Sequence, residues 1–388
     1  MRVFLIVLDG VGMGALPDAA DYGDEGRHTL LHVAEAVGGL RLPALERLGL
    51  GRIATLAGVR AVGDPRGAHG RMAERSKGKD STSGHWELAG LVLERAFPVY
   101  PGGFPTALLD RWGERVGRGW IGNVAASGTE IIERLGPEHQ RGGKLIVYTS
   151  ADSVFQVAAH EAVVPVEMLY DACSLAREML AGEHAVGRVI ARPFTGNAGA
   201  YRRTERRRDF SLVPPAPTLL DRLIERGHPV VTVGKVDQLF AGRGVSEAFH
   251  TGSNAEGEDV LAGLARRRGG GLVFANLVDF DQQYGHRNDP EGFARALEDF
   301  DERLEEILGH LRDDEMCLIT ADHGNDPTTP STDHSREYVP LLVAGRRVRA
   351  GADLGTRETF ADVAATIADL FGVTRPESGT SFLREVRA

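Results

Sequence analysis

One set of aspartate and histidine side chains, spread over several places in this chain of 388 residues, could act together in chemistry. Mixed carboxylate and imidazole ligands suit Mn²⁺ or Zn²⁺, whereas carboxylates alone suit Mg²⁺ or Ca²⁺ better. Any single aspartate among them could instead be a residue that follows a strand and caps the next helix. Together they are enough to hold two neighbouring cations, and we expect them to do so. The six candidate ligands are Asp9, Asp281, His286, Asp322, His323 and His334.

A second segment that could take part in chemistry is GKDSTSGHWELAG, residues 78–90. Its glycines and hydroxyl residues lead into a helix expected near Trp86. A hydroxyl in a tight turn before a helix N-terminus lies where backbone N–H groups favour an oxyanion. A metal ion can activate such a hydroxyl as a nucleophile. A simple Ser/Thr capping turn is the alternative, but Lys77 and Lys79, two of only four lysines in the chain, favour an anionic site.

The elements that would position these groups are short apolar runs, each followed closely by a polar or ionisable residue. Such runs are typical of strands buried on both faces, as in a parallel sheet. Ligands of open parallel sheets bind beyond the carboxyl ends of the strands. The sequence therefore predicts an active site at the edge of a sheet. The runs are Val3–Leu8, Leu145–Tyr148, Val230–Val233, Leu272–Val278 and Met316–Thr320.

Helical patterns lie between the runs. Apolar residues at three- and four-residue steps from Phe293 to Leu311 predict an amphipathic helix that starts at Asp289-Pro290. A second helix is predicted over Ala361–Phe371, with Gly372 ending it. Alternation of strands and helices before residue ~90 and after ~215 indicates one α/β layer structure.

The middle of the chain differs from its two ends. Proline- and glycine-rich stretches at 98–105 and 213–217 resemble linkers and enclose residues with strands and helices of their own. We predict a core formed by residues 1–97 and 213–388, with an inserted domain at 98–212. The basic segment RRTERRR, Arg202–Arg208, is either a solvated face or an anion-binding rim of that domain.

Composition narrows the functional classes. The 45 basic and 55 acidic residues give a net charge of −10, which argues against a nucleic-acid partner. No apolar stretch approaches the ~20 residues of a membrane span, so no membrane association is expected. Cys173 and Cys317 show no pairing pattern, which suits a reducing compartment, and a cytoplasmic location is predicted.

Long motifs along nearly the whole chain resemble the phosphopentomutase family of the alkaline phosphatase superfamily. They are FLIVLDGVG, GKDSTSGHWE, YTSADSVFQVAAHE, GRVIARPF, VGKVDQLF, NLVDFDQQYGHRND, TADHGNDPTTPSTDHSREYVPLL and the C-terminal GTSFL. The resemblance implies an alkaline-phosphatase-like core, with a mostly parallel sheet flanked by helices, and a smaller inserted α/β cap domain.

The same resemblance implies roles for individual residues. Two Mn²⁺ ions are expected, one held by Asp281, His286 and His334. The other would be held by Asp9, Asp322, His323 and the hydroxyl of Ser81. Ser81 occupies the nucleophile position, where the family usually has threonine. The residues implied to line the substrate side are Asp152, Arg188, Arg192 and Lys235.

The implied activity interconverts ribose 1-phosphate and ribose 5-phosphate, or their 2-deoxy counterparts. It would proceed through a phosphoserine and a pentose 1,5-bisphosphate, with that compound or glucose 1,6-bisphosphate as activator. The alternatives are an enzyme like cofactor-independent phosphoglycerate mutase, a metal-dependent phosphatase, and a metal-stabilised binding module without activity. The segment KDSTSGHWE argues against the phosphoglycerate mutase, whose nucleophile motif begins with Asn-Ser-Glu.

Overall fold

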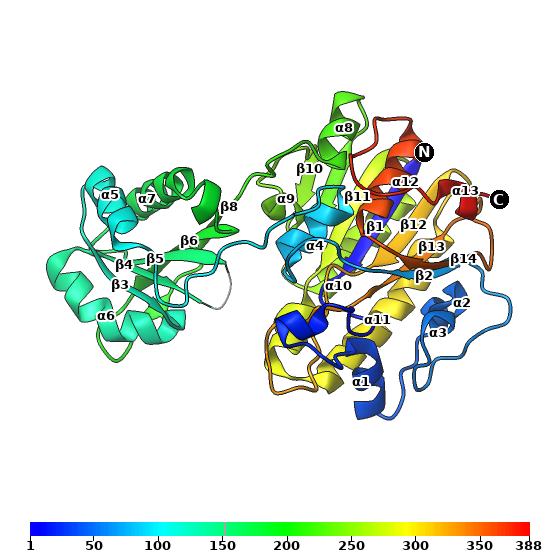
Figure 1. The fold of residues 1–388 in the computed structure, drawn as a ribbon, viewed down its shortest axis with the longest axis horizontal. Helices are drawn as coiled ribbons and strands as arrows, with labels where there is room; N and C mark the ends of the chain where they lie inside the picture. Colours follow the sequence, from blue (N-terminus) through cyan, green and yellow to red (C-terminus); the bar gives the residue numbers. More distant parts are fainter. Residues whose placement is uncertain (151–152) are drawn as a thin grey trace. The chain divides into compact units, whose positions relative to one another are not determined.

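The chain divides into two compact units, which the computed structural model describes over residues 1–150 and 153–388 (Figure 1). The larger unit comprises Met1–Ala96 and Pro214–Ala388, and the smaller unit comprises Phe97–Val213. Asp152, one of the expected substrate contacts, lies outside the described residues. Among the residues that are described, no helix is both long and apolar enough to cross a membrane.

The larger unit is built on an eight-stranded sheet with the order β10-β9-β11-β1-β12-β13-β2-β14 (Figure 1). The strands from β10 to β12 are parallel, β13 runs antiparallel to both of its neighbours, and β14 is parallel to β2. The predicted mostly parallel sheet is therefore confirmed. The strands are β1 Arg2–Leu8, β2 Ala68–Met72, β9 Val230–Val233, β10 Glu247–Phe249, β11 Gly271–Leu277, β12 Glu315–Thr320, β13 Val339–Ala344 and β14 Asp353–Arg357.

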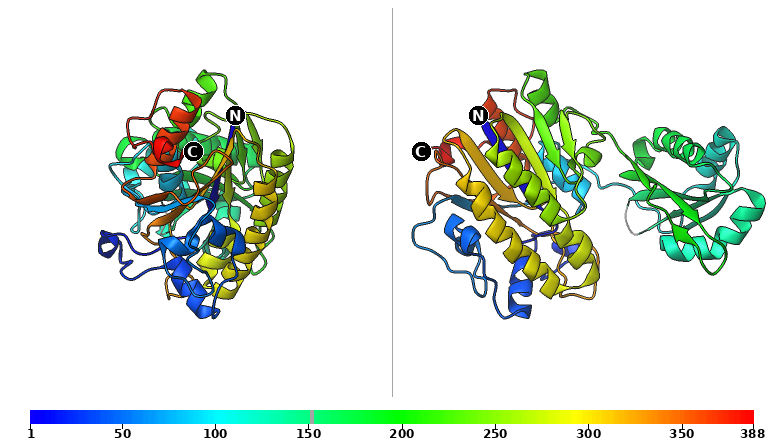
Figure 2. Two further views of the ribbon diagram at one scale, coloured as in Figure 1. Left: turned by 90° about the vertical axis from the view of Figure 1, so that its right-hand side faces the viewer. Right: turned by 180° about the vertical axis from the view of Figure 1, so that it is seen from behind.

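Helices cover both faces of this sheet (Figure 2). Every residue of β1, β11 and β12 is buried, as the unbroken apolar runs predict for strands with two covered faces. The helices are α1 Thr29–Ala36, α2 Pro43–Leu48, α3 Leu50–Ile53, α4 Ser81–Leu88, α8 Leu219–Glu225, α9 Val236–Leu239, α10 Asn254–Arg266, α11 Pro290–Gly309, α12 Ala361–Phe371 and α13 Leu383–Val386.

Local signals determine where three of these helices begin or end. The Asp289 side chain accepts a hydrogen bond from Gly292 N at 2.8 Å and starts α11 as predicted. Helix α12 has the predicted bounds and ends at Gly372, which has a φ of 66°. Helix α4 differs from the prediction because it begins at Ser81, well before Trp86. The Asp80 side chain caps it by accepting hydrogen bonds from two backbone N–H groups of its first turn.

In its described residues, the smaller unit holds a six-stranded mixed sheet, three α-helices and the short 3-10 helix Gly182–His184. Its strand order is β3-β4-β5-β6-β7, with β8 also paired to β6. The run expected at Leu145–Tyr148 is β4, which is parallel to β3 but antiparallel to β5. The predicted α/β fold class is thus confirmed in both units. The elements are α5 Thr106–Val116, β3 Trp120–Ala125, α6 Gly128–Gly142, β4 Leu145–Thr149, β5 Val154–His160, α7 Val166–Met179, β6 Arg188–Thr195, β7 Arg202–Arg203 and β8 Arg208–Ser211.

Candidate metal centre and nucleophile

Three neighbouring strands bring the acidic candidates to one edge of the larger sheet. Strand β1 lies between β11 and β12 and is parallel to both, so their carboxyl ends meet. Asp9 follows β1 directly, and Asp322 and His323 follow β12. Asp281 follows β11 in a single π-helical turn, Phe280–Tyr284, a feature often found at functional sites.

The first ligand group consists of Asp281, His286 and His334, whose candidate ligand atoms all lie within 4.8 Å of one another. The Asp281 oxygens lie 3.1 Å from His286 Nε2 and 3.3 Å from His334 Nε2. His286 Nδ1 lies 2.6 Å from the Thr332 carbonyl oxygen, which leaves Nε2 directed at Asp281. His334 is not at a strand end but in the long loop between β12 and β13.

A second group of Asp9, Asp281 and His323 meets the same 4.8 Å limit. His323 Nε2 lies 3.3 Å from Asp9 Oδ1 and 3.5 Å from Asp322 Oδ2. Asp281 belongs to both groups, so the six candidates form one continuous cluster.

Ser81 joins the cluster from the first position of α4. Its Oγ lies 3.2 Å from His323 Nε2, and the residue is half-buried. Hydrogen bonds from Thr82 N and Ser83 N to the Asp80 side chain fix the turn that carries it. The adjacent hydroxyl of Ser83 is buried and donates instead to Glu74 Oε1 at 3.0 Å. Ser81 Oγ therefore approaches the cluster of candidate ligands, whereas Ser83 Oγ contacts Glu74.

The charges of the cluster are strongly coupled. Burial raises the pKa of Asp9, and the nearby carboxylates of Asp322 and Asp281 raise it further. Burial would also raise the pKa of Asp281, but the nearby imidazoles of His334 and His286 outweigh it and hold that pKa well below its usual range. The pKa of Asp9 is thus raised and that of Asp281 is lowered, because the imidazoles nearby offset the charge of Asp281 more than that of Asp9.

The bonding of the buried ligand atoms is compatible with metal ions. Asp9 Oδ1, Asp322 Oδ2 and His334 Nε2 are buried and each lies at ion-pair distance from an oppositely charged group, but none has a hydrogen bond of good geometry within the described part of the chain. Buried polar atoms without partners are unfavourable unless a ligand satisfies them. Because two carboxylate oxygens and an imidazole nitrogen are metal ligands, divalent cations of the Mn²⁺ or Zn²⁺ type match this set.

Side chains that the sequence analysis did not single out hold the candidate ligands in place. Asn276 Nδ2 donates to Asp9 Oδ2 at 3.1 Å, and Asn325 Nδ2 donates to Asp281 Oδ1 at 2.7 Å. His85 Nδ1 lies 3.1 Å from Asp322 Oδ2. Asn325 could have been found from the sequence, because it closely follows the candidate ligands Asp322 and His323.

The expected substrate contacts are divided between the two units. Lys235, in the larger unit, donates to Gln282 Oε1 at 2.7 Å, and Gln282 directly follows Asp281 in the sequence. Arg188 and Arg192 lie on β6 of the smaller unit, where Arg192 Nε donates to Gln156 Oε1 at 2.7 Å. The five arginines of Arg202–Arg208 are all exposed, which is compatible with both interpretations of that segment.

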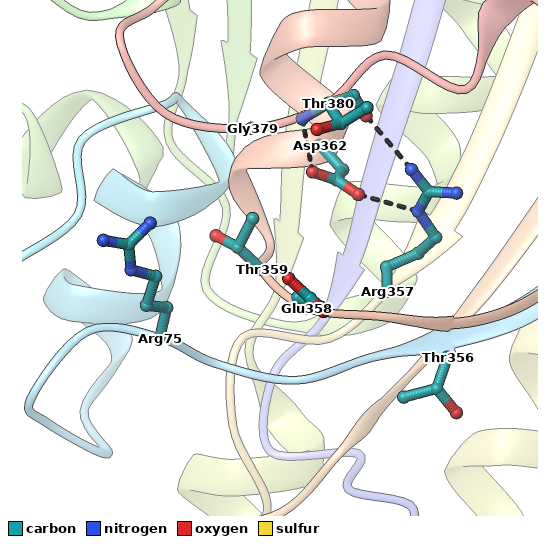
Figure 3. A pocket seen from close by; sticks show the side chains of 8 residues that line it. All are labelled: Arg75, Thr356, Arg357, Glu358, Thr359, Asp362, Gly379 and Thr380. Carbon is teal, nitrogen blue, oxygen red and sulfur yellow. Dashed lines mark hydrogen bonds and ion pairs between the residues drawn. The ribbon is translucent and has the colours of Figure 1, made fainter.

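A hollow of about 500 Å³ in the larger unit has a different lining from the metal-ligand cluster (Figure 3). Two of its charged residues pair with each other, since Arg357 lies 2.7 Å from Asp362, and Arg357 also pairs with Glu385 at 3.2 Å. It is lined by Arg75, Thr356, Arg357, Glu358, Thr359, Asp362, Gly379 and Thr380.

Comparison with known proteins assigns the chain to a family. A model of the metalloenzyme superfamily matches residues 1–375, and the chain belongs to that superfamily. A phosphopentomutase from Acetivibrio thermocellus is 56% identical over 385 residues, covering 99% of each chain. A phosphopentomutase from Carboxydothermus hydrogenoformans is 56% identical over 386 residues, covering 100% of this chain and 99% of the relative. Within the superfamily, the chain belongs to the phosphopentomutase family.

The predicted enzyme class, an isomerase of the phosphomutase type, is confirmed by these relatives. A solved structure, the PH0037 protein from Pyrococcus horikoshii, has the same fold at 18% identity. Its TM-score is 0.50, and the match covers 98% of this chain and 99% of that protein. Together with the buried ligand cluster, the family assignment supports a metal-dependent enzyme.

Proposed function

We propose that this enzyme interconverts ribose 1-phosphate and ribose 5-phosphate, or their 2-deoxy counterparts, with Ser81 carrying the phosphoryl group. The observation that carries the proposal is the Ser81 hydroxyl, 3.2 Å from His323 Nε2 beside the buried carboxylates. The names of relatives that match almost the whole chain supply the substrate class.

We propose that two Mn²⁺ ions occupy the cluster, one at Asp281, His286 and His334. The other would use Asp9, Asp322, His323 and the Ser81 hydroxyl. When bound, such ions neutralise phosphoryl charge and lower the pKa of a bound hydroxyl. The chain itself holds Ser81 at the start of α4 and orients the carboxylates through Asn276 and Asn325.

The proposed reaction conserves its phosphoryl groups. The bond between phosphorus and Ser81 Oγ breaks as the free hydroxyl of the sugar phosphate attacks, loses its proton and gives a pentose 1,5-bisphosphate. The other phosphoryl group then returns to Ser81 Oγ, and the second sugar hydroxyl recovers a proton. A sugar bisphosphate, either this intermediate or glucose 1,6-bisphosphate, would load Ser81 for the first turnover. Positioning and charge neutralisation provide most of the rate in such transfers.

We further propose that residues 1–97 and 213–388 form the catalytic core, and that residues 98–212 act as a cap. A mutase must keep water away from its phosphoserine, or it becomes a phosphatase. The arginines of β6 suit this domain to bind an anionic sugar phosphate, with Arg188 and Arg192 as the proposed contacts. Lys235 is proposed to contact the substrate from the core.

Substitution of Ser81 tests the proposal. Mn²⁺-loaded protein would be incubated with ribose 1-phosphate and a trace of glucose 1,6-bisphosphate, and the product followed by phosphorus NMR. Ser81→Ala should abolish isomerisation, because the hydroxyl that carries the phosphoryl group is lost. Ser81→Thr keeps the hydroxyl, and its rate should stay within about tenfold, equivalent to ~1.4 kcal/mol of barrier.

Mass spectrometry provides the matched control. After priming, intact wild type and Ser81→Thr should gain the mass of one phosphate, and Ser81→Ala should gain none. Fragmentation should place the phosphate on residue 81. Phosphate on Thr82 or Ser83, or continued turnover of the alanine variant, would contradict the assignment of Ser81.

A further inference from the structure

The loop that leads into Ser81 is held by one buried guanidinium from a distant part of the chain. The Arg336 side chain is 1% exposed. Its Nη1 donates to the carbonyl oxygens of Ser76 at 2.8 Å and Gly78 at 2.6 Å, and its Nη2 donates to that of Glu74 at 2.9 Å. A loop without regular secondary structure thus has three carbonyl groups fixed by one rigid, planar side chain.

The contacts of Arg336 continue into the first turn of α4. Its Nη1 also pairs with Glu74 Oε2 at 2.8 Å. The other oxygen of Glu74 accepts a hydrogen bond from Ser83 Oγ at 3.0 Å. Ser83 Oγ also lies 2.9 Å from the Asp80 carbonyl oxygen and accepts a hydrogen bond from Asp80 N at 3.3 Å. Arg336 is therefore linked through Glu74 to the residues on both sides of Ser81.

Arg336 also belongs to the segment that presents His334. Its backbone N donates to Asp24 Oδ2 at 3.0 Å, and Lys79 Nζ lies 3.0 Å from that same oxygen. Lys79 Nζ pairs in addition with Asp333 Oδ2 at 3.2 Å. The loop before Ser81 and the segment around His334 are thus joined at two places, one on each side of His334.

We propose that Arg336 is a positioning residue that fixes the Ser81 hydroxyl relative to the imidazole of His334. It acts through the loop 74–80 and does not touch the substrate, and this role rests on the function proposed above. Small displacements of a reacting group reduce rates by up to about 100-fold, so a fixed loop has a direct catalytic consequence. A buried ion pair that only stabilises the fold would have no such consequence.

A second buried pair in the same unit provides a matched control. Arg2 and Glu315 pair at 2.8 Å with exposures of 3% and 2%, against 1% and 2% for Arg336 and Glu74. Arg2 also donates to a backbone carbonyl, that of Leu264, at 2.7 Å. It lies at the start of β1, whereas Asp9 follows the end of that strand. Both pairs can be neutralised by the same substitutions.

The experiment compares R336M/E74Q with R2M/E315Q. We expect kcat for isomerisation to fall 30- to 100-fold in R336M/E74Q with KM within about twofold. Hydrogen exchange of the backbone amides of residues 76–81 should become at least about tenfold faster in that variant. R2M/E315Q should change neither quantity, even where it lowers the melting temperature.

Equal kcat and equal amide exchange in the two double variants would overturn the proposed role of Arg336. If wild type does not isomerise pentose phosphates, the proposed function fails, whereas hydrogen exchange still decides whether Arg336 orders the loop. Should R336M/E74Q fail to fold, Arg336→Lys replaces it. Lysine keeps the charge but cannot hold three carbonyls in the same geometry, so kcat should fall with little change in melting temperature. Unchanged kcat and amide exchange in that variant would equally overturn the role.

Discussion

Glu87 and Glu337 are buried carboxylates that differ in the kind of donor each one faces. Their exposed fractions are 0% and 1%. Glutamine has nearly the same shape as glutamate but replaces one acceptor oxygen by a donating NH₂ group. The same substitution should therefore have different effects on stability at the two positions, according to whether the surrounding donors can also accept.

Both oxygens of Glu87 face backbone N–H groups, which can only donate. Oε2 accepts from Ser76 N at 2.6 Å. Oε1 accepts from Arg75 N at 2.9 Å, Phe360 N at 3.0 Å and Thr359 Oγ1 at 2.7 Å. Arg75 and Thr359 also line the hollow of Figure 3. In either orientation, the NH₂ group of a glutamine would oppose at least one backbone N–H.

Glu337 faces backbone donors on one side only. Oε2 accepts from Gly14 N at 3.0 Å and Thr29 N at 2.9 Å. Oε1 accepts from the hydroxyls of Thr29 and Ser335, both at 2.7 Å. Hydroxyl groups rotate and can accept, so a glutamine could keep its oxygen toward the backbone and donate to these two side chains.

The expected magnitudes follow from these donors. Glu87→Gln loses a charge-assisted hydrogen bond, about 1.5–3 kcal/mol, and leaves a buried N–H unsatisfied, about 1–3 kcal/mol, so it should destabilise the larger unit by roughly 3–5 kcal/mol. Glu337→Gln should destabilise it by only about 1 kcal/mol. Urea unfolding of the two variants and wild type at neutral pH measures both values. Equal destabilisation by the two substitutions would refute the reasoning from donor type.

Two further predictions concern metal removal and pH. Chelation should abolish isomerisation, and Mn²⁺ should restore it better than Ca²⁺, which prefers larger, oxygen-rich shells; full activity of the stripped protein would contradict the metal centre. Burial raises the pKa of Glu258 from 4.5 to about 7, so the folded state favours the protonated carboxyl. The contribution of this proton to the free energy of unfolding is therefore fully present below pH 4.5 and is lost as the pH rises through 7. The rise in pKa corresponds to at most about 3.4 kcal/mol of unfolding free energy. Because Glu258→Gln stays neutral, urea unfolding should show it to be more stable than wild type by roughly 1–3 kcal/mol at pH 8. Near pH 4.5 the two proteins should be about equally stable. The exposed Glu291→Gln is the control, and the same stability difference at both pH values for Glu258→Gln would contradict the assigned cause.

Elements that are determined by local sequence could be predicted from the sequence. The apolar runs at β1, β11 and β12 are long enough to be recognised as buried strands, and their parallel pairing places Asp9, Asp281 and Asp322 at one edge. Helix α12 agrees with its prediction in both bounds because Gly372 gives an unambiguous end.

Features that depend on tertiary contacts could not be predicted in this way. Strand β13 contains Pro340, which usually argues against a central strand, yet here it pairs with Arg71 of β2. The start of α4 at Ser81 depends on Asp80, whose capping effect outweighs the weak helix propensity of the serine, threonine and glycine that follow. The Arg336 contacts join residues about 260 positions apart, which residue spacing does not reveal.

The arrangement of charge at the sheet edge is itself an argument about function. Three carboxylates, those of Asp9, Asp281 and Asp322, are buried together, and burial of like charges destabilises a fold. The imidazoles of His334 and His286 lie beside Asp281, whereas the buried Asp9 Oδ1 and Asp322 Oδ2 have imidazole nitrogens at 3.1–3.5 Å but no hydrogen bond of good geometry within the described part of the chain. In natural proteins, buried polar and charged groups that lack full compensation by the protein occur mainly at functional sites. The metal centre proposed above therefore also has an electrostatic reason, since a bound cation would offset the charge of the three buried carboxylates.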